Sequence, residues 1–297
     1  MSNNYMIENY INIARNFKKK AQLIKALQFY NKAYKLKEGK KNIELLLDLA
    51  LIYDEMGNFY MAREKYLEVL NIDEEERAYY GLAILYDDLG DYKKAIEYYE
   101  KAININPFYH KAYFFIANVY DEIGEKEKAI KYYKEAAEIQ PMDFWTHINL
   151  GCIYEELDKN KLALKEMEKA LEIMPNHYMA LFNMGVILKK LCEYNKAIKY
   201  YSMSIRENKK HGYSFLNLAV LYKELGQYDK AISTISEGIS NNPYESYLYY
   251  NRGCFYVHQN LIKEAIEDIR TAVKLNPDFI EYMKDDEELK SIKDVFQ

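Results

Sequence analysis

All five prolines of this chain lie on one grid with a spacing of 34 residues. Pro107, Pro141 and Pro175 follow one another at that interval, and Pro243 and Pro277 continue it after one omitted step. A fixed period of this size indicates a repeat architecture, in which each repeat packs on its neighbours. Such arrays expose a long surface rather than one deep cleft, so the spacing favours a binding protein over an enzyme.

Other positions recur on the same grid when the chain is divided into eight repeats. The repeats begin near Ile7, Ile43, Glu76, His110, Phe144, Tyr178, Gly212 and Ser246. The eighth residue of each repeat is Ala or Gly, and the twentieth is always Ala, as at Ala197. The eleventh and twenty-fourth residues are large and mostly aromatic. Small residues predict a close approach of two helices, and the bulky ones fill the space around that contact.

This pattern resembles the tetratricopeptide repeat, a helix–turn–helix unit of 34 residues. The segment from Tyr79 to Pro107, YYGLAILYDDLGDYKKAIEYYEKAININP, is representative, and the resemblance extends over residues 7–277. It implies an all-α fold, a right-handed α-solenoid (superhelix) of eight repeats closed by a C-terminal capping helix within residues 278–297.

The C-terminal segment carries apolar residues suited to a cap. Phe279, Ile280 and Met283 are expected to seal repeat eight. Leu289, Ile292, Val295 and Phe296 are expected to form the apolar stripe of a short final helix. The alternative role of this stripe is a contact with a second copy of the chain.

Charge is distributed unevenly along the chain. Residues 1–42 hold ten Lys/Arg and two Asp/Glu, a net of +8, whereas residues 43–143 hold eleven and twenty-two, a net of −11. A nucleic-acid-binding protein should carry a basic stripe along its binding face, so no nucleic-acid partner is expected. The basic first repeat, with Lys18, Lys19 and Lys20 at a helix end, is either a solvated cap or a handle for an acidic partner. The acidic repeats of another copy would also fit it, so self-association is possible.

Several classes of protein lack support in this sequence. It has no run of eighteen apolar residues and no secretion signal at its start, so we expect a cytoplasmic protein without a membrane partner. Cys152, Cys192 and Cys254 are widely spaced and read as reduced packing residues, while the five histidines lack metal-ligand spacing. No catalytic motif is present, so no catalytic residue, metal or cofactor is expected. Abundant Lys, Ile, Tyr and Asn with little Arg favour an AT-rich, bacterial genome.

The resemblance also implies where a ligand would bind. The first helix of each repeat lines the inner wall of such arrays, and positions two, five, six, nine, twelve and thirteen share one side of it. Position six is an asparagine in the last four repeats: Asn149, Asn183, Asn217 and Asn251. An amide has donors and an acceptor, so this row can hold a peptide backbone of any sequence. Gly81 and Phe115 interrupt the row earlier in the chain, and the alternative is that Asn is merely a common residue of the repeat.

Two further rows on the same wall are candidate contacts. Position two carries large residues in the later repeats, Trp145, Met179, Tyr213 and Tyr247, which are typical anchors for a partner. Position twelve opens a doubled acid in successive repeats, including Asp87, Asp121 and Glu155. These acids form either a lane for a Lys/Arg-containing segment or ordinary solvated helix ends.

One departure from the repeat predicts a specific contact. Arg252 occupies a position that is usually leucine, and Asp268 follows on the second helix of the same repeat. A half-buried guanidinium needs a carboxylate, so we expect the two to pair. The alternative is an arginine whose stem packs on apolar surface while its head stays in water.

The sequence therefore favours a non-enzymatic interaction scaffold that binds an extended peptide segment of a protein partner. The first alternative is an oligopeptide-sensing regulator that acts through a separate effector protein. The second is an accessory subunit of an enzyme complex whose catalytic part is another chain.

Overall fold

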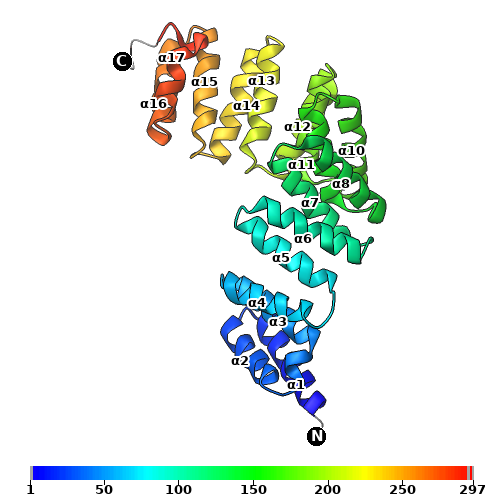
Figure 1. The fold of residues 1–297 in the computed structure, drawn as a ribbon. Coiled ribbons are helices and arrows are strands. Elements are labelled where there is room, and N and C mark those ends of the chain that lie inside the picture. The colour runs from blue at the N-terminus through cyan, green and yellow to red at the C-terminus, as the bar shows by residue number, and fades with distance from the viewer. Residues whose placement is uncertain (1–2, 293–294, 296–297) are drawn as a thin grey trace. The chain divides into compact units, whose positions relative to one another are not determined.

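The computed structural model describes residues 3–292 and 295, and its regular elements are all helical (Figure 1). Within that part of the chain there are seventeen α-helices, two short 3₁₀ helices and no β-strand. The all-α, helix–turn–helix fold expected from the sequence is thus confirmed. Contacts divide the chain into two compact parts, Met1–Met142 and Asp143–Gln297, which we call the N-terminal half and the C-terminal half.

The N-terminal half contains four helix pairs. They are α1 (Asn3–Lys19) with α2 (Leu23–Tyr34), α3 (Ile43–Glu55) with α4 (Phe59–Leu70), α5 (Glu76–Asp88) with α6 (Tyr92–Ile105), and α7 (His110–Glu122) with α8 (Lys126–Ile139). The 3₁₀ helix η1 (Gly39–Lys41) extends the first repeat. Gly39 is required there, because a Cβ at this position would lie 2.1 Å from the carbonyl oxygen of Ala33.

The C-terminal half contains four more pairs and the cap. They are α9 (Phe144–Glu156) with α10 (Asn160–Ile173), α11 (Tyr178–Lys190) with α12 (Tyr194–Glu207), α13 (Gly212–Glu224) with α14 (Tyr228–Asn241), and α15 (Ser246–His258) with α16 (Ile262–Leu275). The elements α17 (Phe279–Asp285) and η2 (Glu287–Leu289) follow. From α3 onward, each first helix starts at the residue where the 34-residue pattern starts a repeat, whereas α1 starts earlier, at Asn3 rather than Ile7.

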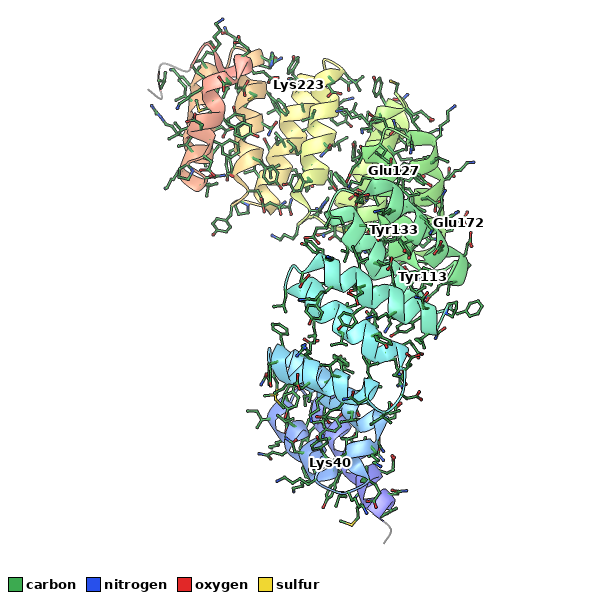
Figure 2. The ribbon with its side chains drawn as sticks, viewed as in Figure 1. Lys40, Tyr113, Glu127, Tyr133, Glu172 and Lys223 are labelled. Atoms are coloured by element: carbon green, nitrogen blue, oxygen red, sulfur yellow. The ribbon has the colours of Figure 1, made fainter. Side chains whose placement is uncertain are left out.

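The recurring spacing of small and large residues in the eight repeats produces close helix contacts within each pair. The alanine at position twenty is 0% exposed in all eight repeats, and every residue at position twenty-four is buried. Where position eight is glycine, the large residue of the same repeat occupies the space of the missing side chain. A Cβ at Gly151 would lie 2.4 Å from Met167, and one at Gly185 would lie 2.7 Å from Tyr201. In repeat four, the hydroxyl of Tyr133 on α8 (labelled in Figure 2) donates to Asn118 on α7.

The two helices of each pair are joined by a residue with a positive φ at position fifteen. Glycine occupies this position in four repeats, with φ from +71° to +81°. The other four repeats have Ala21, Asp158, Cys192 and Asn260, with φ from +54° to +60°. This conformation strains Ala21 and Cys192 more than Asp158 and Asn260, because Asp and Asn tolerate it better. Backbone hydrogen bonds close these turns, such as the bond from the Glu193 amide to the Leu188 carbonyl oxygen at 2.8 Å.

The predicted pair of Arg252 and Asp268 is confirmed. The Arg252 Nε and Nη2 atoms donate to the two Asp268 carboxylate oxygens at 2.6 and 2.8 Å, and Nη1 donates to the Ser236 hydroxyl at 2.8 Å. Asp268 is 6% exposed, so the guanidinium neutralises a buried carboxylate.

The cap agrees with the sequence in part. Met283, Leu289 and Ile292 are buried in a core cluster with residues of α13 to α16, and Phe279 packs against it. Ile280 does not seal the repeat, since it is 47% exposed. The predicted final helix is wrong for the described residues: Leu289 ends η2, and the Asp286 carboxylate accepts from the Glu288 amide in place of a continuing helical turn. Val295 is 47% exposed, and Phe296 lies outside the described residues.

Candidate functional site

The first helices of repeats two, three and four line a groove of about 570 Å³ in the N-terminal half, which we call the inner groove. On α3 its lining residues are Glu44, Leu47, Asp48, Leu51 and Asp54, which are positions two, five, six, nine and twelve. The same positions of α5 line it together with position thirteen, Asp88, and α7 adds positions two and six. The prediction that these positions share one side of the first helices is therefore confirmed for this groove.

The floor of the inner groove is apolar and aromatic. Leu51, Ile84, Tyr80 and Phe115 line it, and Leu51 is 43% exposed. The Tyr80 ring meets the Phe115 ring edge-on, with 5.9 Å between centroids. Aromatic rings that hold one another in this way form a rigid surface on which an apolar side chain can pack.

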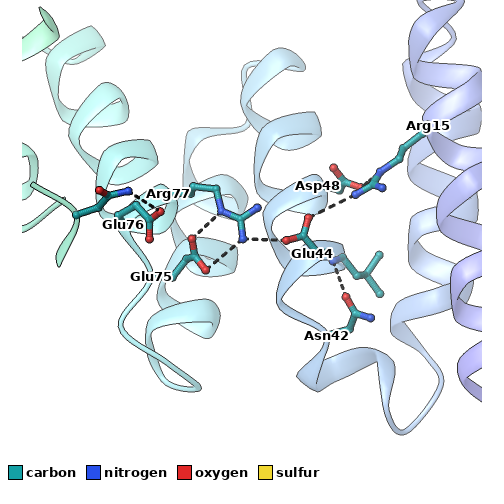
Figure 3. A network of polar contacts seen from close by, with 9 residues as sticks. Arg15, Asn42, Glu44, Asp48, Glu75, Glu76 and Arg77 are labelled. Carbon is teal, nitrogen blue, oxygen red and sulfur yellow. Dashed lines mark hydrogen bonds and ion pairs between the residues drawn. The ribbon is translucent and has the colours of Figure 1, made fainter. Parts of the chain in front are cut away.

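A network of ion pairs occupies one end of the groove (Figure 3). Arg15 of α1 binds Asp48 at 2.7 Å and Glu44 at 3.6 Å, and Arg77 of α5 binds Glu44 at 2.8 Å and Glu75 at 2.6 Å. The hydrogen bond from Arg77 lowers the pKa of the Glu75 carboxyl. The carboxylates at this end are thus already neutralised by arginines of neighbouring repeats.

The opposite end of the groove carries carboxylates that no arginine of the described residues neutralises. Asp54, Asp87 and Asp88 line it near the C-terminal ends of α3 and α5. Burial raises the pKa of the Asp54 carboxyl, and the charges of Asp88 and Glu55 raise it further. Burial likewise raises the pKa of Asp87, although a hydrogen bond from Tyr99 opposes the shift. This end therefore concentrates negative charge.

The floor also explains why the amide row is interrupted in repeat three. The ring of Tyr66 from α4 lies over Gly81, and a Cβ at Gly81 would be 2.2 Å from the Tyr66 Cζ atom. An asparagine cannot occupy this position while the tyrosine remains. Tyr66 is 3% exposed and lines the groove. A buried tyrosine here takes the place that an amide has in the later repeats.

The predicted amide row lies on α9, α11, α13 and α15 of the C-terminal half, and its side chains are half-buried. The Nδ2 atoms of Asn217 and Asn251 donate to the carbonyl oxygens of Tyr213 and Tyr247, one turn earlier on their own helices. Asn183 Nδ2 donates to Cys152 Sγ at 3.3 Å. Each of these three contacts uses one amide hydrogen, and an amide has a second hydrogen and an oxygen to offer.

The predicted position-two row differs in exposure from residue to residue. Trp145 and Tyr213 are 46% and 53% exposed, whereas Met179 and Tyr247 are half-buried. The rings of Tyr213 and Tyr247 stack, with centroids 4.8 Å apart and an interplanar angle of 9°. Trp145 stands edge-on to His177 at 5.5 Å. Exposed aromatic rings that are fixed by neighbours suit partner binding.

The other predicted acids are engaged within the chain. Asp121 binds Lys126 at 2.6 Å, and Glu155 binds Lys190 of the next repeat at 2.7 Å. The basic first repeat also pairs locally, because Lys18 binds Glu55 at 2.8 Å. Asp87 therefore differs from Asp121 and Glu155, since a tyrosine hydroxyl and not a cation contacts its carboxylate.

The described residues contain no group of three or more His, Cys, Asp or Glu arranged to hold a metal ion. No helix of residues 3–292 combines the length and apolar character that crossing a membrane requires. Cys152, Cys192 and Cys254 are free thiols, and burial raises the pKa of Cys254.

The candidate residues predicted from the sequence lie mainly in the later repeats. Among the residues that line the inner groove, they include Asp87 but not Arg77, Lys111, Tyr80 or Phe115. A signal was present, because these residues occupy positions two, five and six of repeats three and four. The asparagine row does not indicate these residues, because it runs through the last four repeats.

Comparison with known families identifies the repeats. Tetratricopeptide repeat models match residues 43–76, 76–109, 110–142, 146–177 and 246–279. A model of anaphase-promoting complex subunit 5 matches residues 193–242. No curated protein matches the sequence significantly.

Solved structures share the fold at low sequence identity. A tetratricopeptide repeat protein from Parabacteroides merdae is 19% identical with a TM-score of 0.61, covering 79% of this chain and 93% of that one. Pseudomonas aeruginosa pilF is 24% identical with a TM-score of 0.58, covering 68% and 92%. A chain of the APC/C Cut9–Hcn1 hetero-tetramer is 17% identical with a TM-score of 0.59, covering 92% of this chain and 52% of that one. These similarities show the fold alone.

Proposed function

This chain belongs to the tetratricopeptide repeat family, and we propose that it is a non-enzymatic scaffold that binds an extended segment of a partner protein. The inner groove carries this proposal, because residues from three successive first helices form one continuous lining there. Its apolar floor can pack against apolar side chains of a ligand, and its charged ends can bind charged ones. Such a groove suits an extended segment of a protein.

The amide and aromatic rows of the C-terminal half are proposed as a second contact region for the same kind of ligand. Asn183 and Asn217 would hold backbone groups, while Trp145 and Tyr213 would take side chains. Replacing both asparagines by alanine is expected to weaken binding of such a segment and to leave the fold intact, since neither side chain lies in the contact between paired helices.

The proposal is tested by comparing proteins captured from native cell extract by the wild type and by variants. Leu51→Arg places a large charged side chain on the floor of the inner groove, where Leu51 is 43% exposed. Ile24→Arg is the matched control, because Ile24 is 68% exposed on α2 and does not line the groove. Overlapping synthetic peptides of any protein lost only with Leu51→Arg are then titrated against the purified chain.

The expected result is a linear peptide that binds the wild type and the Ile24→Arg control equally and Leu51→Arg at least tenfold more weakly. Equal binding to all three proteins would contradict the groove as the site. A retained free oligopeptide, in place of a protein, would instead support the peptide-sensing regulator, and co-purification with an enzyme would support the accessory subunit.

A further inference from the structure

We propose that the inner groove selects a segment with a Lys or Arg beside an aromatic or branched apolar residue, and that Asp54, Asp87 and Asp88 hold the cation. This inference rests on the function proposed above and names the chemistry of the ligand. It commits to a basic segment of a protein partner rather than to a metal ion or a second copy of the chain.

Charge complementarity is the first observation that supports a cationic ligand. The acids at the other end of the groove are bound to Arg15 and Arg77. Asp54, Asp87 and Asp88 have no ion pair among the described residues, and Lys18, the cation that acts on Asp54, is itself bound to Glu55. Burial and then the charges of neighbouring carboxylates raise the pKa values of Asp54 and Asp87, and a bound cation would offset the repulsion among these carboxylates.

The hydroxyl of Tyr66 is the second, independent observation. The Tyr66 residue is 3% exposed and lines the groove beside Gly81, and its hydroxyl makes no hydrogen bond to another residue within 3–292. At the same position of the next two repeats, Tyr99 donates to Asp87 and Tyr133 donates to Asn118. The hydroxyls of Tyr30 and Tyr201 at this position are also unpaired within that part of the chain, but they are fully enclosed, whereas that of Tyr66 is not. The Tyr66 hydroxyl can therefore meet a ligand group in the groove.

The floor of the groove suits the rest of a basic side chain. Leu51, Ile84 and Phe115 can cover the alkyl stem of a Lys or Arg whose head reaches the acids. The exposed part of Leu51 also offers a surface for the apolar neighbour of the basic residue. Carboxylates alone would attract any cation. The adjoining apolar floor favours a cation that is carried on an alkyl side chain, such as that of Lys or Arg.

The test selects peptides from a random displayed library against the full-length wild type and then measures binding of the enriched peptides. The acid variant is Asp87→Asn with Asp88→Asn, which keeps side-chain shape while removing two charges. Its matched control is Glu127→Gln with Glu172→Gln, which removes two charges from exposed residues of α8 and α10 (Figure 2). Leu51→Arg reports whether a peptide uses the groove at all.

Three outcomes separate this inference from the proposed function. The expected peptides contain Lys or Arg next to an apolar residue, lose binding with Leu51→Arg, and bind the acid variant roughly 10- to 100-fold more weakly while the control stays within about twofold. Groove-dependent peptides without a basic residue, or with equal affinity for the acid variant, would overturn this inference alone. Failure to enrich any peptide that Leu51→Arg weakens would overturn both.

Discussion

The pair of Arg252 and Asp268 offers a quantitative test of how this chain tolerates charge in its core. Arg252→Leu removes the guanidinium that makes two hydrogen bonds to the carboxylate, and Asp268 is then left 6% exposed without a counterion. Breaking a buried ion pair in this way is destabilising by about 3–5 kcal/mol. This loss of unfolding free energy cannot exceed about 4 kcal/mol, because protonating a carboxylate of ordinary pKa near 4 at pH 7 costs about that much and removes the buried charge. We therefore expect a loss of about 3–4 kcal/mol.

The chain supplies its own compensated control. Repeat seven has Leu218 and Thr234 at the two equivalent positions, so the double variant Arg252→Leu with Asp268→Thr copies a pair that the fold already accommodates. With no charge left in the core, this double variant should recover to within about 1 kcal/mol of the wild type.

Urea denaturation followed by circular dichroism gives the overall free energies. Native-state hydrogen exchange of α15 and α16 shows whether the loss is local, as expected for a repeat array. The deficit of the single variant should shrink as the pH falls toward 4. A single variant within about 1 kcal/mol of the wild type, or a double variant worse than the single, would refute the reasoning.

Three further outcomes follow from the packing and the charges. Ala197→Leu, at a position that is 0% exposed, should lower the free energy of unfolding by about 1–3 kcal/mol in urea titrations, whereas Lys196→Leu at the exposed neighbouring position should not. Cys192→Gly should raise it by about 1 kcal/mol, because φ is +60° there, and an unchanged melting temperature would argue against strain. Asp54→Asn with Asp87→Asn should stabilise the chain by a few tenths of a kcal/mol at pH 7. Burial and like charges raise the pKa values of these two carboxyl groups in the folded state. The two groups therefore stabilise the folded state fully only below their unfolded pKa, and this contribution is lost as the pH rises through their folded pKa. The gain should therefore vanish in acid, and a gain that persists at low pH would contradict it.

Most of the fold could be predicted because its determinants recur every 34 residues. A single small residue such as Ala197 or a single large one such as Tyr201 does not predict a helix contact. A small and a large residue at these two positions in all eight repeats predict which helix faces meet. The C-terminal end was predicted less well, because Ile280 and Leu289 lie outside the repeats. No equivalent positions in other repeats indicate which of the two is buried. Asp286 ends the helical path there by accepting from the Glu288 amide, a local contact that the apolar spacing does not reveal.

The site was harder to predict than the fold because its properties depend on pairs of residues from different helices. Gly81 looked like a gap in the amide row, and only the position of Tyr66 shows that the gap is filled. Asp87, Asp121 and Glu155 are equivalent by sequence, yet lysines neutralise the last two and not the first. Position along the repeat indicates which side chains face inward, whereas their partners decide which of them can meet a ligand.

The single tryptophan of the chain makes the C-terminal half optically distinct. Trp145 is 46% exposed and stands edge-on to His177, whose pKa is lowered by burial, so the imidazole beside the indole is uncharged at neutral pH. Its emission should shift to shorter wavelength when another molecule covers the indole, and acidification should quench it as His177 gains a proton. Intrinsic fluorescence can therefore follow occupancy of the aromatic row without a label.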